Sequence, residues 1–275
     1  MKKILITGVG SYIGDSVAQY LLKEPEKYSV DMIDAAGYEP KAEDFRGYDV
    51  VFNVAGIAHR KETEENRELY YKVNRDLSVE IANAAKAGGV KQLILMSTMS
   101  VYGKTTGHIT KETPVDPKNA YGFSKAQADE EISKLEGDGF KFACLRPPMV
   151  YGKGCKGNYQ RLRSFALKYP VFPSYKNERS MIYIGNLCEF VKTIIDSETG
   201  GLFFPQNCEY VRTCDMVEKI SLVNGKTTRL TGVFNAAIKL FEVGAMKKVF
   251  GSLTYEKTDT VDKFSFDQSI ELTEN

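Results

Sequence analysis

Short apolar runs alternate with longer helix-like segments over the first two-thirds of the chain. Each run has the length of a strand buried in a parallel sheet, and such runs occur at Lys3–Ile6, Val30–Ile33, Val50–Val54, Gln92–Met96 and Phe142–Leu145. The helix-like segments between them are Ser16–Lys23, Glu68–Ala87 and Lys125–Leu135. Strands that alternate with helices form right-handed βαβ units. The pattern therefore predicts an α/β fold with a doubly wound parallel sheet.

The regular alternation ends near Gly152. Three prolines interrupt the remainder: Pro170, Pro173 and Pro205. Because proline lacks a backbone N–H, it favours turns and loops over long regular elements. We therefore expect a Rossmann domain over residues 1–152. Residues 153–275 are expected to form a smaller C-terminal lobe, interleaved with the last strands of the sheet.

The composition is that of an ordinary globular protein, with 275 residues, 43% hydrophobic and 27% charged. Lysine and arginine (37) nearly balance aspartate and glutamate (36), so nucleic acid is not an expected partner. No apolar run approaches the roughly 18 residues of a membrane span. The stretch Val233–Leu253 is apolar with scattered lysines, which is compatible with a membrane-surface helix, but a lobe helix with a solvated lysine face is favoured, so no membrane partner is expected. Five cysteines without a C-x-x-C pair, and a first apolar run too short for a signal peptide, indicate reduced thiols and a cytoplasmic location. With only two histidines, no metal site is expected.

A glycine-containing loop, Thr7–Gly14, follows the first predicted strand, and a helix is expected to begin near Asp15. Glycines at such a turn let the backbone approach a pyrophosphate, which the positive end of the following helix stabilises. The alternative is a tight turn that needs glycine for its own geometry. Its position at the first strand-to-helix turn favours a dinucleotide site.

Asp34 stands twenty residues after Gly14, at the end of the second predicted strand. A carboxylate there accepts hydrogen bonds from the ribose hydroxyls and repels a 2′-phosphate, which favours NAD over NADP. Asp31 is the local alternative for this role. The chain between Asp34 and Asp49 is short, so we expect a reduced third strand with fewer contacts to adenine.

A candidate catalytic set follows the strand that ends at Met96. Tyr121 and Lys125 are four residues apart, so they share one face of a predicted helix. A neighbouring ammonium would lower the tyrosine pKa from about 10 and make Tyr121 a general base. Thr98 would share the hydrogen bond to the reacting oxygen. Taken alone, a tyrosine and a lysine at this spacing are more often a solvated helix face, but here they follow a dinucleotide loop.

In this order, the motifs resemble the extended short-chain dehydrogenase/reductase family, in particular its NAD-dependent epimerase/dehydratase members, which include UDP-galactose 4-epimerase. Thr7–Gly14 is similar to the family's T-G-x-x-G-x-x-G loop, with Ser11 in place of the middle glycine. Tyr121–Lys125 is similar to Y-x-x-x-K, and Leu145–Gly152 is similar to L-R-P-x-x-V-Y-G. The resemblance covers nearly the whole chain.

The resemblance implies that residues 1–152 bind NAD and that residues 153–275 bind the substrate. It assigns catalysis to Thr98, Tyr121 and Lys125. The residues implied to contact NAD are Gly8, Ser11, Tyr12, Ile13, Gly14, Asp34, Ala55, Asn74 and Lys125.

Two segments of the C-terminal part, Gly157–Tyr159 and Asn177–Tyr183, resemble a bacterial branch that acts on UDP-linked N-acetylated hexoses. The branch includes 4-epimerases and 4-keto-sugar reductases. The resemblance implies that Arg179 holds the diphosphate and that Asn158 also contacts the substrate, together with Thr98 and Tyr121. A loop-packing role is the alternative for Asn158 and Arg179. Gly185 departs from the family, which has an aspartate at this position.

The residues after Thr98 narrow the reaction. Family dehydratases carry Asp-Glu there, whereas this chain has Met99 and Ser100, which do no acid–base work at neutral pH. Elimination and decarboxylation are therefore disfavoured. We predict an NAD-dependent 4-epimerase of UDP-hexose or UDP-N-acetylhexosamine, acting through a 4-keto intermediate. The alternatives are an NAD(P)H-dependent 4-keto-sugar reductase of surface polysaccharide synthesis and a non-catalytic dinucleotide sensor. The oligomeric state stays open, with a homodimer among the candidates.

Overall fold

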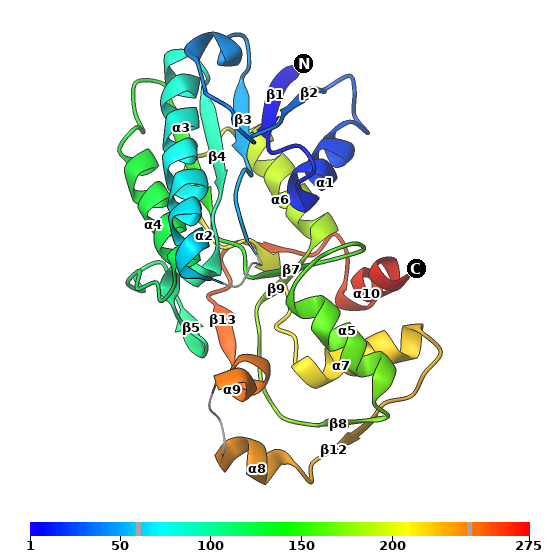
Figure 1. Cartoon of the computed structure of the whole chain (residues 1–275). Helices are drawn as coiled ribbons and strands as arrows, with labels where there is room; N and C mark the ends of the chain where they lie inside the picture. Colours follow the sequence, from blue (N-terminus) through cyan, green and yellow to red (C-terminus); the bar gives the residue numbers. More distant parts are fainter. Residues whose placement is uncertain (59–61, 241–243) are drawn as a thin grey trace. The chain divides into compact units, whose positions relative to one another are not determined.

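The computed structural model describes residues 1–58, 62–240 and 244–275 (Figure 1). The chain forms two compact units, and it passes between them several times. The first unit consists of Met1–Gly103, Pro114–Pro147 and Cys188–Phe203. The second unit consists of Lys104–Thr113, Pro148–Leu187 and Phe204–Asn275.

A six-stranded parallel sheet forms the centre of the first unit, in the order β10-β6-β4-β3-β1-β2. Its strands are β1 (Lys2–Thr7), β2 (Tyr28–Ile33), β3 (Val50–Asn53), β4 (Gln92–Met96), β6 (Lys141–Leu145) and β10 (Gly201–Phe203). All five strands predicted from apolar runs are present. The two central strands β3 and β4 are buried at every residue, which explains why their sequences are continuously apolar rather than alternating. The prediction of a doubly wound parallel sheet is confirmed.

The strand β2 lies at the edge of this sheet, because no further strand follows it before β3. The intervening chain contains only a short 3₁₀ helix, η1 (Ala42–Phe45). The structure thus has no strand between Asp34 and Asp49, and the expected loss of adenine contacts stays a prediction. Tyr48 donates a hydrogen bond of 2.9 Å to Asp31 in the edge strand.

The helices of the first unit differ from the predicted bounds at their ends. They are α1 (Tyr12–Leu21), α2 (Glu64–Tyr71), α3 (Leu77–Ala87), α4 (Ala120–Ser133) and α6 (Ile184–Ser197), the last of which begins in the second unit. A π-helical turn, η2 (Lys72–Asp76), joins α2 to α3, so the segment predicted as one helix is divided. Side chains of α3 and α4 pack on the sheet in one core, which includes Ile81, Leu93 and Ile132.

The second unit contains short parallel strand pairs and five helices within its described residues. The pairs are β7 (Met149–Tyr151) with β9 (Met181–Tyr183), β8 (Val171–Pro173) with β12 (Arg229–Thr231), β5 (Gly107–Ile109) with β13 (Leu253–Tyr255), and β11 (Gln206–Asn207) with β14 (Thr260–Val261). The helices are α5 (Asn158–Lys168), α7 (Thr213–Val223), α8 (Asn235–Leu240), α9 (Gly244–Phe250) and α10 (Phe266–Glu274). Across the described ranges, no helix is long and apolar enough to cross a membrane.

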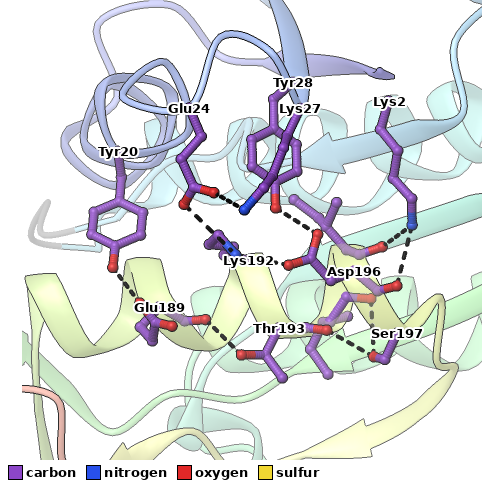
Figure 2. A network of polar contacts seen from close by, with 12 residues as sticks. Lys2, Tyr20, Glu24, Lys27, Tyr28, Glu189, Lys192, Thr193, Asp196 and Ser197 are labelled. Carbon is purple, nitrogen blue, oxygen red and sulfur yellow. Dashed lines mark hydrogen bonds and ion pairs between the residues drawn. The ribbon is translucent and has the colours of Figure 1, made fainter.

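A set of charged and polar side chains links α6 to the turn after α1 and to the first two strands (Figure 2). Lys192 of α6 forms ion pairs with Asp196 at 2.8 Å and with Glu24 at 3.7 Å. The Tyr28 phenol donates to Asp196 at 2.5 Å, and Lys2 donates to the Ile195 carbonyl at 2.6 Å. We call Lys2, Glu24, Tyr28, Lys192 and Asp196 the α6 network.

Candidate active site

The loop between β1 and α1 is closely packed against the end of β3. Gly8 has a φ of +105°, and a Cβ atom there would lie 3.2 Å from the Ala55 nitrogen. A Cβ atom on Gly14 would lie 2.8 Å from the Val54 Cγ2 atom. Glycine is therefore required at both positions. The loop ends in the N-terminus of α1, the arrangement that binds a pyrophosphate, so these residues fit the dinucleotide predicted from the sequence.

Ser11, which departs from the family's middle glycine, is the N-cap of α1. Its φ of −76° and ψ of 127° are ordinary for a residue with a side chain, and its hydroxyl accepts a hydrogen bond from the Gly14 nitrogen at 3.3 Å. The exchange therefore introduces no backbone strain. Tyr12 and Ile13 follow in the first helical turn, where both are half-buried. The helix begins three residues before the predicted Asp15 because Ser11 caps it.

Asp34 is exposed directly after β2 and accepts a hydrogen bond of 3.0 Å from the Ala36 nitrogen. Its competitor Asp31 lies within the edge strand and accepts from Tyr48. Asp34 is therefore better placed for the ribose role. An open cavity of about 880 Å³ lies beside it, between the residues that follow β2 and those of α2, η2 and α3; its walls include Ala35, Tyr38, Leu69, Tyr71 and Leu77.

The chain after β3 is held in place by Asn74, which is fully buried in η2. The Asn74 amide accepts from the Ile57 nitrogen at 2.7 Å and donates to the Ile57 carbonyl and to the Ser124 hydroxyl, at 3.1 and 3.2 Å. Ala55 is buried and donates to the Asn53 side chain at 3.2 Å. Asn74 therefore fixes the backbone beside the glycine loop.

Thr98 and Tyr121 come together at the end of β4. Thr98 caps the 3₁₀ helix η3 (Met99–Tyr102), and Tyr121 lies in the first turn of α4, which Asn119 caps. A hydrogen bond from Thr98 lowers the pKa of Tyr121, but burial raises this pKa by more. The expectation that Tyr121 has a lowered pKa is therefore wrong for this structure, because removing a phenolate from water costs more than the hydrogen bond returns.

Lys125 lies on the same face of α4 and is buried, with 4% of its surface exposed. Its ammonium donates to the Met96 carbonyl at 2.9 Å, and it lies beside Gly56, whose added Cβ would be 3.2 Å away. Burial lowers the pKa of Lys125 to about 8. The lysine thus lies beside the chain that follows β3, and its hydrogen bond within the described part of the chain goes to a backbone carbonyl rather than to the phenol.

A second buried group, which the sequence reasoning missed, lies one turn beyond Lys125. Asp129 accepts from the Ser97 hydroxyl at 2.7 Å and from Arg146 Nε at 2.9 Å. Arg146 also donates to the Tyr102 phenol at 2.7 Å. Burial raises the pKa of Asp129, while this carboxylate raises the pKa of Arg146 and keeps the guanidinium charged. We call Ser97, Tyr102, Asp129 and Arg146 the Asp129 network.

In the second unit, Arg179 is half-buried between β8 and β9. Its side chain donates to the Gly251 carbonyl at 2.7 Å, and burial lowers its pKa. Among the described residues, no carboxylate lies within ion-pair distance of Arg179. Asn158 is exposed as the first residue of α5. Packing explains why glycine occupies position 185, since a Cβ atom there would lie 2.6 Å from the Tyr183 ring.

Comparison with known proteins identifies the family. The model described as the NAD dependent epimerase/dehydratase family matches residues 4–203. The chain belongs to this family and is an enzyme whose cofactor is NAD.

Two relatives are epimerases by name. UDP-glucose 4-epimerase of Vibrio cholerae is 28% identical over 297 residues, which cover 98% of this chain and 88% of the relative. N-acetyl-alpha-D-glucosaminyl-diphospho-ditrans,octacis-undecaprenol 4-epimerase of Escherichia coli O157:H7 is 26% identical over 215 residues, which cover 72% of this chain and 64% of the relative.

Solved structures share the fold. UDP-glucuronic acid 4-epimerase from Bacillus cereus, in complex with NAD, matches with a TM-score of 0.79 and 18% identity, over 98% of this chain and 95% of that chain. A dTDP-4-dehydrorhamnose reductase from Clostridium acetobutylicum matches with a TM-score of 0.76 and 19% identity, over 98% of each chain.

Proposed function

We propose that the protein is a 4-epimerase of hexoses linked to a diphosphate, most plainly UDP-hexose or UDP-N-acetylhexosamine. The observation that carries the proposal is the contact between Thr98 and Tyr121, with Lys125 on the same helix face. This set moves one proton at a hydroxyl group, and Met99 and Ser100 supply no acid or base for elimination. The names of the relatives agree with this reaction.

In the proposed reaction, Thr98 and Tyr121 hydrogen-bond to the oxygen on C4 of the sugar, and Tyr121 removes its proton as the alcohol becomes a ketone. Bound NAD supplies the nicotinamide ring that takes up the hydride and returns it. The ketone then turns its other face, and Tyr121 gives the proton back. Lys125 would hold the ribose that carries the nicotinamide ring.

We propose that Asp34 holds the adenosine ribose and selects NAD over NADP, as in other Rossmann folds. We propose that the cavity beside Asp34 takes the adenine, because its walls contain aromatic and aliphatic side chains, together with charged side chains of α2, η2 and α3. Arg179 is proposed to bind the substrate diphosphate, since a half-buried guanidinium without a carboxylate partner favours an anion. The Asp34→Ala variant should reduce the ratio of the affinity for NAD to the affinity for NADP. Equal affinities for the two cofactors in the native protein would exclude a selective role for Asp34.

The assay is the conversion of UDP-N-acetylglucosamine, or UDP-glucose, into its C4 epimer without added reduced cofactor. Tyr121→Phe should reduce turnover by a factor of about 10² to 10⁴, with cofactor binding retained. Tyr20→Phe, which removes a phenol from α1 beside α6, is the matched control and should keep normal turnover. Near-normal turnover in Tyr121→Phe would exclude the assignment.

The second candidate is a 4-keto-sugar reductase. This reaction needs the same contact between Thr98 and Tyr121, with the protonated phenol as the acid for the ketone oxygen. If the enzyme oxidises NADH or NADPH when a 4-keto-6-deoxy sugar nucleotide is added, and forms no epimer from the UDP-hexoses, it is the reductase. Tight dinucleotide binding with neither activity would identify a sensor.

A further inference from the structure

The second unit exposes an apolar surface where β12 leads into α8. Val233 is 80% exposed and Phe234 is 49% exposed, and Ala236 and Ala237 on the first turn of α8 are exposed as well. Val171 of the neighbouring strand β8 is 39% exposed. We call Val171, Val233, Phe234, Ala236 and Ala237 the α8 patch. Exposure of two large apolar side chains next to each other is unfavourable in water, so the patch indicates a surface that becomes covered.

The backbone beneath the patch is held in one conformation. Val233 donates its N–H to the Thr231 hydroxyl at 3.3 Å, and Asn235 donates its N–H to the Gly232 carbonyl at 3.0 Å. The strand before it pairs with β8 (Figure 1), and Ile238 on the inner face of α8 is 2% exposed. The exposed side chains of the α8 patch therefore belong to an ordered element. The inner face of α8 already packs against the second unit through Ile238.

Exposed basic side chains occur in the same segment of the chain as the α8 patch. Lys226, Arg229, Lys239 and Lys248 are all exposed, and none of them forms an ion pair with a carboxylate of the described residues. Residues 224–250 contain five basic side chains and one acidic side chain, Glu242, which lies outside the described residues. This segment of the chain is therefore more basic than the chain as a whole, whose net charge is only +1.

We propose that the α8 patch docks this enzyme onto a membrane surface that contains anionic phospholipid. Exposed valine and phenylalanine side chains enter the boundary between headgroups and acyl chains, while lysine and arginine beside them attract the anionic headgroups. The proposal does not depend on the reaction, because docking is a property of the surface. If the proposed function holds, docking brings the active site to sugars linked through a diphosphate to a membrane lipid.

The test measures co-sedimentation of the full-length protein with lipid vesicles. Vesicles of phosphatidylcholine with roughly one third phosphatidylglycerol should bind the protein, whereas phosphatidylcholine alone should bind it weakly. The Val233→Ser/Phe234→Ser variant should lose binding to the anionic vesicles by a factor of about ten or more. Lys239→Glu/Lys248→Glu should also lose binding, as should the native protein in high salt.

The matched control is Leu272→Ser. Leu272 is 48% exposed on α10, in a helix that also carries Asp267, Glu271 and Glu274. This substitution removes a similar apolar side chain from acidic surroundings and should leave vesicle binding unchanged. Because the exchanged side chains are exposed, all variants should unfold at the native temperature, which circular dichroism checks.

The proposal is overturned if anionic vesicles do not bind the native protein, or if the α8 variants bind as well as Leu272→Ser does. Self-association that the α8 variants abolish, without vesicle binding, would assign the patch to a second copy of the chain instead. Turnover of UDP-sugars in the absence of vesicles is measured in parallel. If the protein turns over UDP-sugars but does not bind vesicles, only the docking proposal fails. If it binds vesicles but shows no turnover, only the proposed function fails.

Discussion

The first unit contains two polar networks with the same kind of partners and opposite surroundings. In the α6 network, Lys192 and Asp196 keep 17% and 43% of their side-chain surface exposed (Figure 2). In the Asp129 network, Arg146 and Asp129 keep 11% and 4%. Water screens the first pair and solvates either partner when it is alone. In the buried pair no water can solvate a charge that has lost its partner, so Arg146 and Asp129 each need the other to offset the cost of burial.

The difference matters for the chemistry. Asp129 follows Lys125 by one helical turn and raises its pKa, against the lowering effect of burial. The charge state of Lys125, which we propose to be catalytic, is therefore coupled to the buried carboxylate of Asp129. The exposed α6 network joins elements of the first unit without any such coupling.

The largest effect should come from Arg146→Met. This variant leaves the Asp129 carboxylate buried without its cation, which should cost about 3 to 5 kcal/mol of unfolding free energy. Urea denaturation measures the loss. Arg212→Met is the control, because the Arg212–Asp215 pair has good geometry but is 40% and 39% exposed, and its loss should cost less than about 1 kcal/mol. Similar losses in the two variants would contradict the comparison.

The pH profile should report the coupling inside the catalytic helix. If the cationic form of Lys125 is active, kcat/KM falls as the pH rises above about 8, where the ammonium loses its proton. Asp129→Asn removes a negative charge and should move this fall to lower pH. Asp196→Asn, made in the exposed network, should leave the profile unchanged. A rate that rises through pH 8 to 9 in the native enzyme would argue against a cationic lysine.

Lys192→Met should have a smaller effect, because the ion pair that it removes is partly exposed, even though the same ammonium lies 5.6 Å from the centroid of the Tyr28 ring. We expect a loss below about 1 kcal/mol at low salt, and the difference from the native protein should disappear near 1 M salt. Thermal unfolding at two salt concentrations measures this. A loss that persists at high salt would show that the α6 network is not screened as its exposure implies.

The smallest effect concerns acid stability. The Lys192 ammonium and the Tyr28 phenol hold the pKa of Asp196 below its ordinary value of 3.8, despite the raising effect of partial burial. A lowered folded-state pKa contributes stability above the unfolded pKa, and this contribution is lost as the pH falls through the folded value. Asp196→Asn should therefore flatten the decline in stability below about pH 4 by a small amount. An unchanged slope would indicate that solvent already screens the carboxylate.

The sheet of the first unit could be predicted because its strands are buried on both faces, which leaves continuous apolar runs in the sequence. The short pairs of the second unit could not, because strands of two or three residues carry no period. The division of the predicted helix at η2 also leaves no sequence pattern. Asn119 is the N-cap of α4, and such a capping residue is a sequence signal for a helix that begins five residues before the predicted start at Lys125.

In the site, spacing alone predicted that Tyr121 and Lys125 share a helix face. The direction of the tyrosine pKa could not be predicted, because burial depends on what the rest of the chain places around a residue. Asp129 continues the same face at the next turn, so the spacing contained a signal for it. Its partner Arg146 directly follows strand β6, and only the fold brings the two side chains together.

The order in which the sheet is assembled follows from β10 being its last strand. Lys2 in β1 donates to the Ile195 carbonyl, 193 residues further along the chain. At a synthesis rate of about 5 to 20 residues per second, roughly 10 to 40 s separate the appearance of these two residues on the ribosome. During the last part of this delay, β6 has no neighbour on its outer side, and its unpaired edge can pair with another nascent chain. We expect chaperone dependence during synthesis to peak before residue 203 emerges.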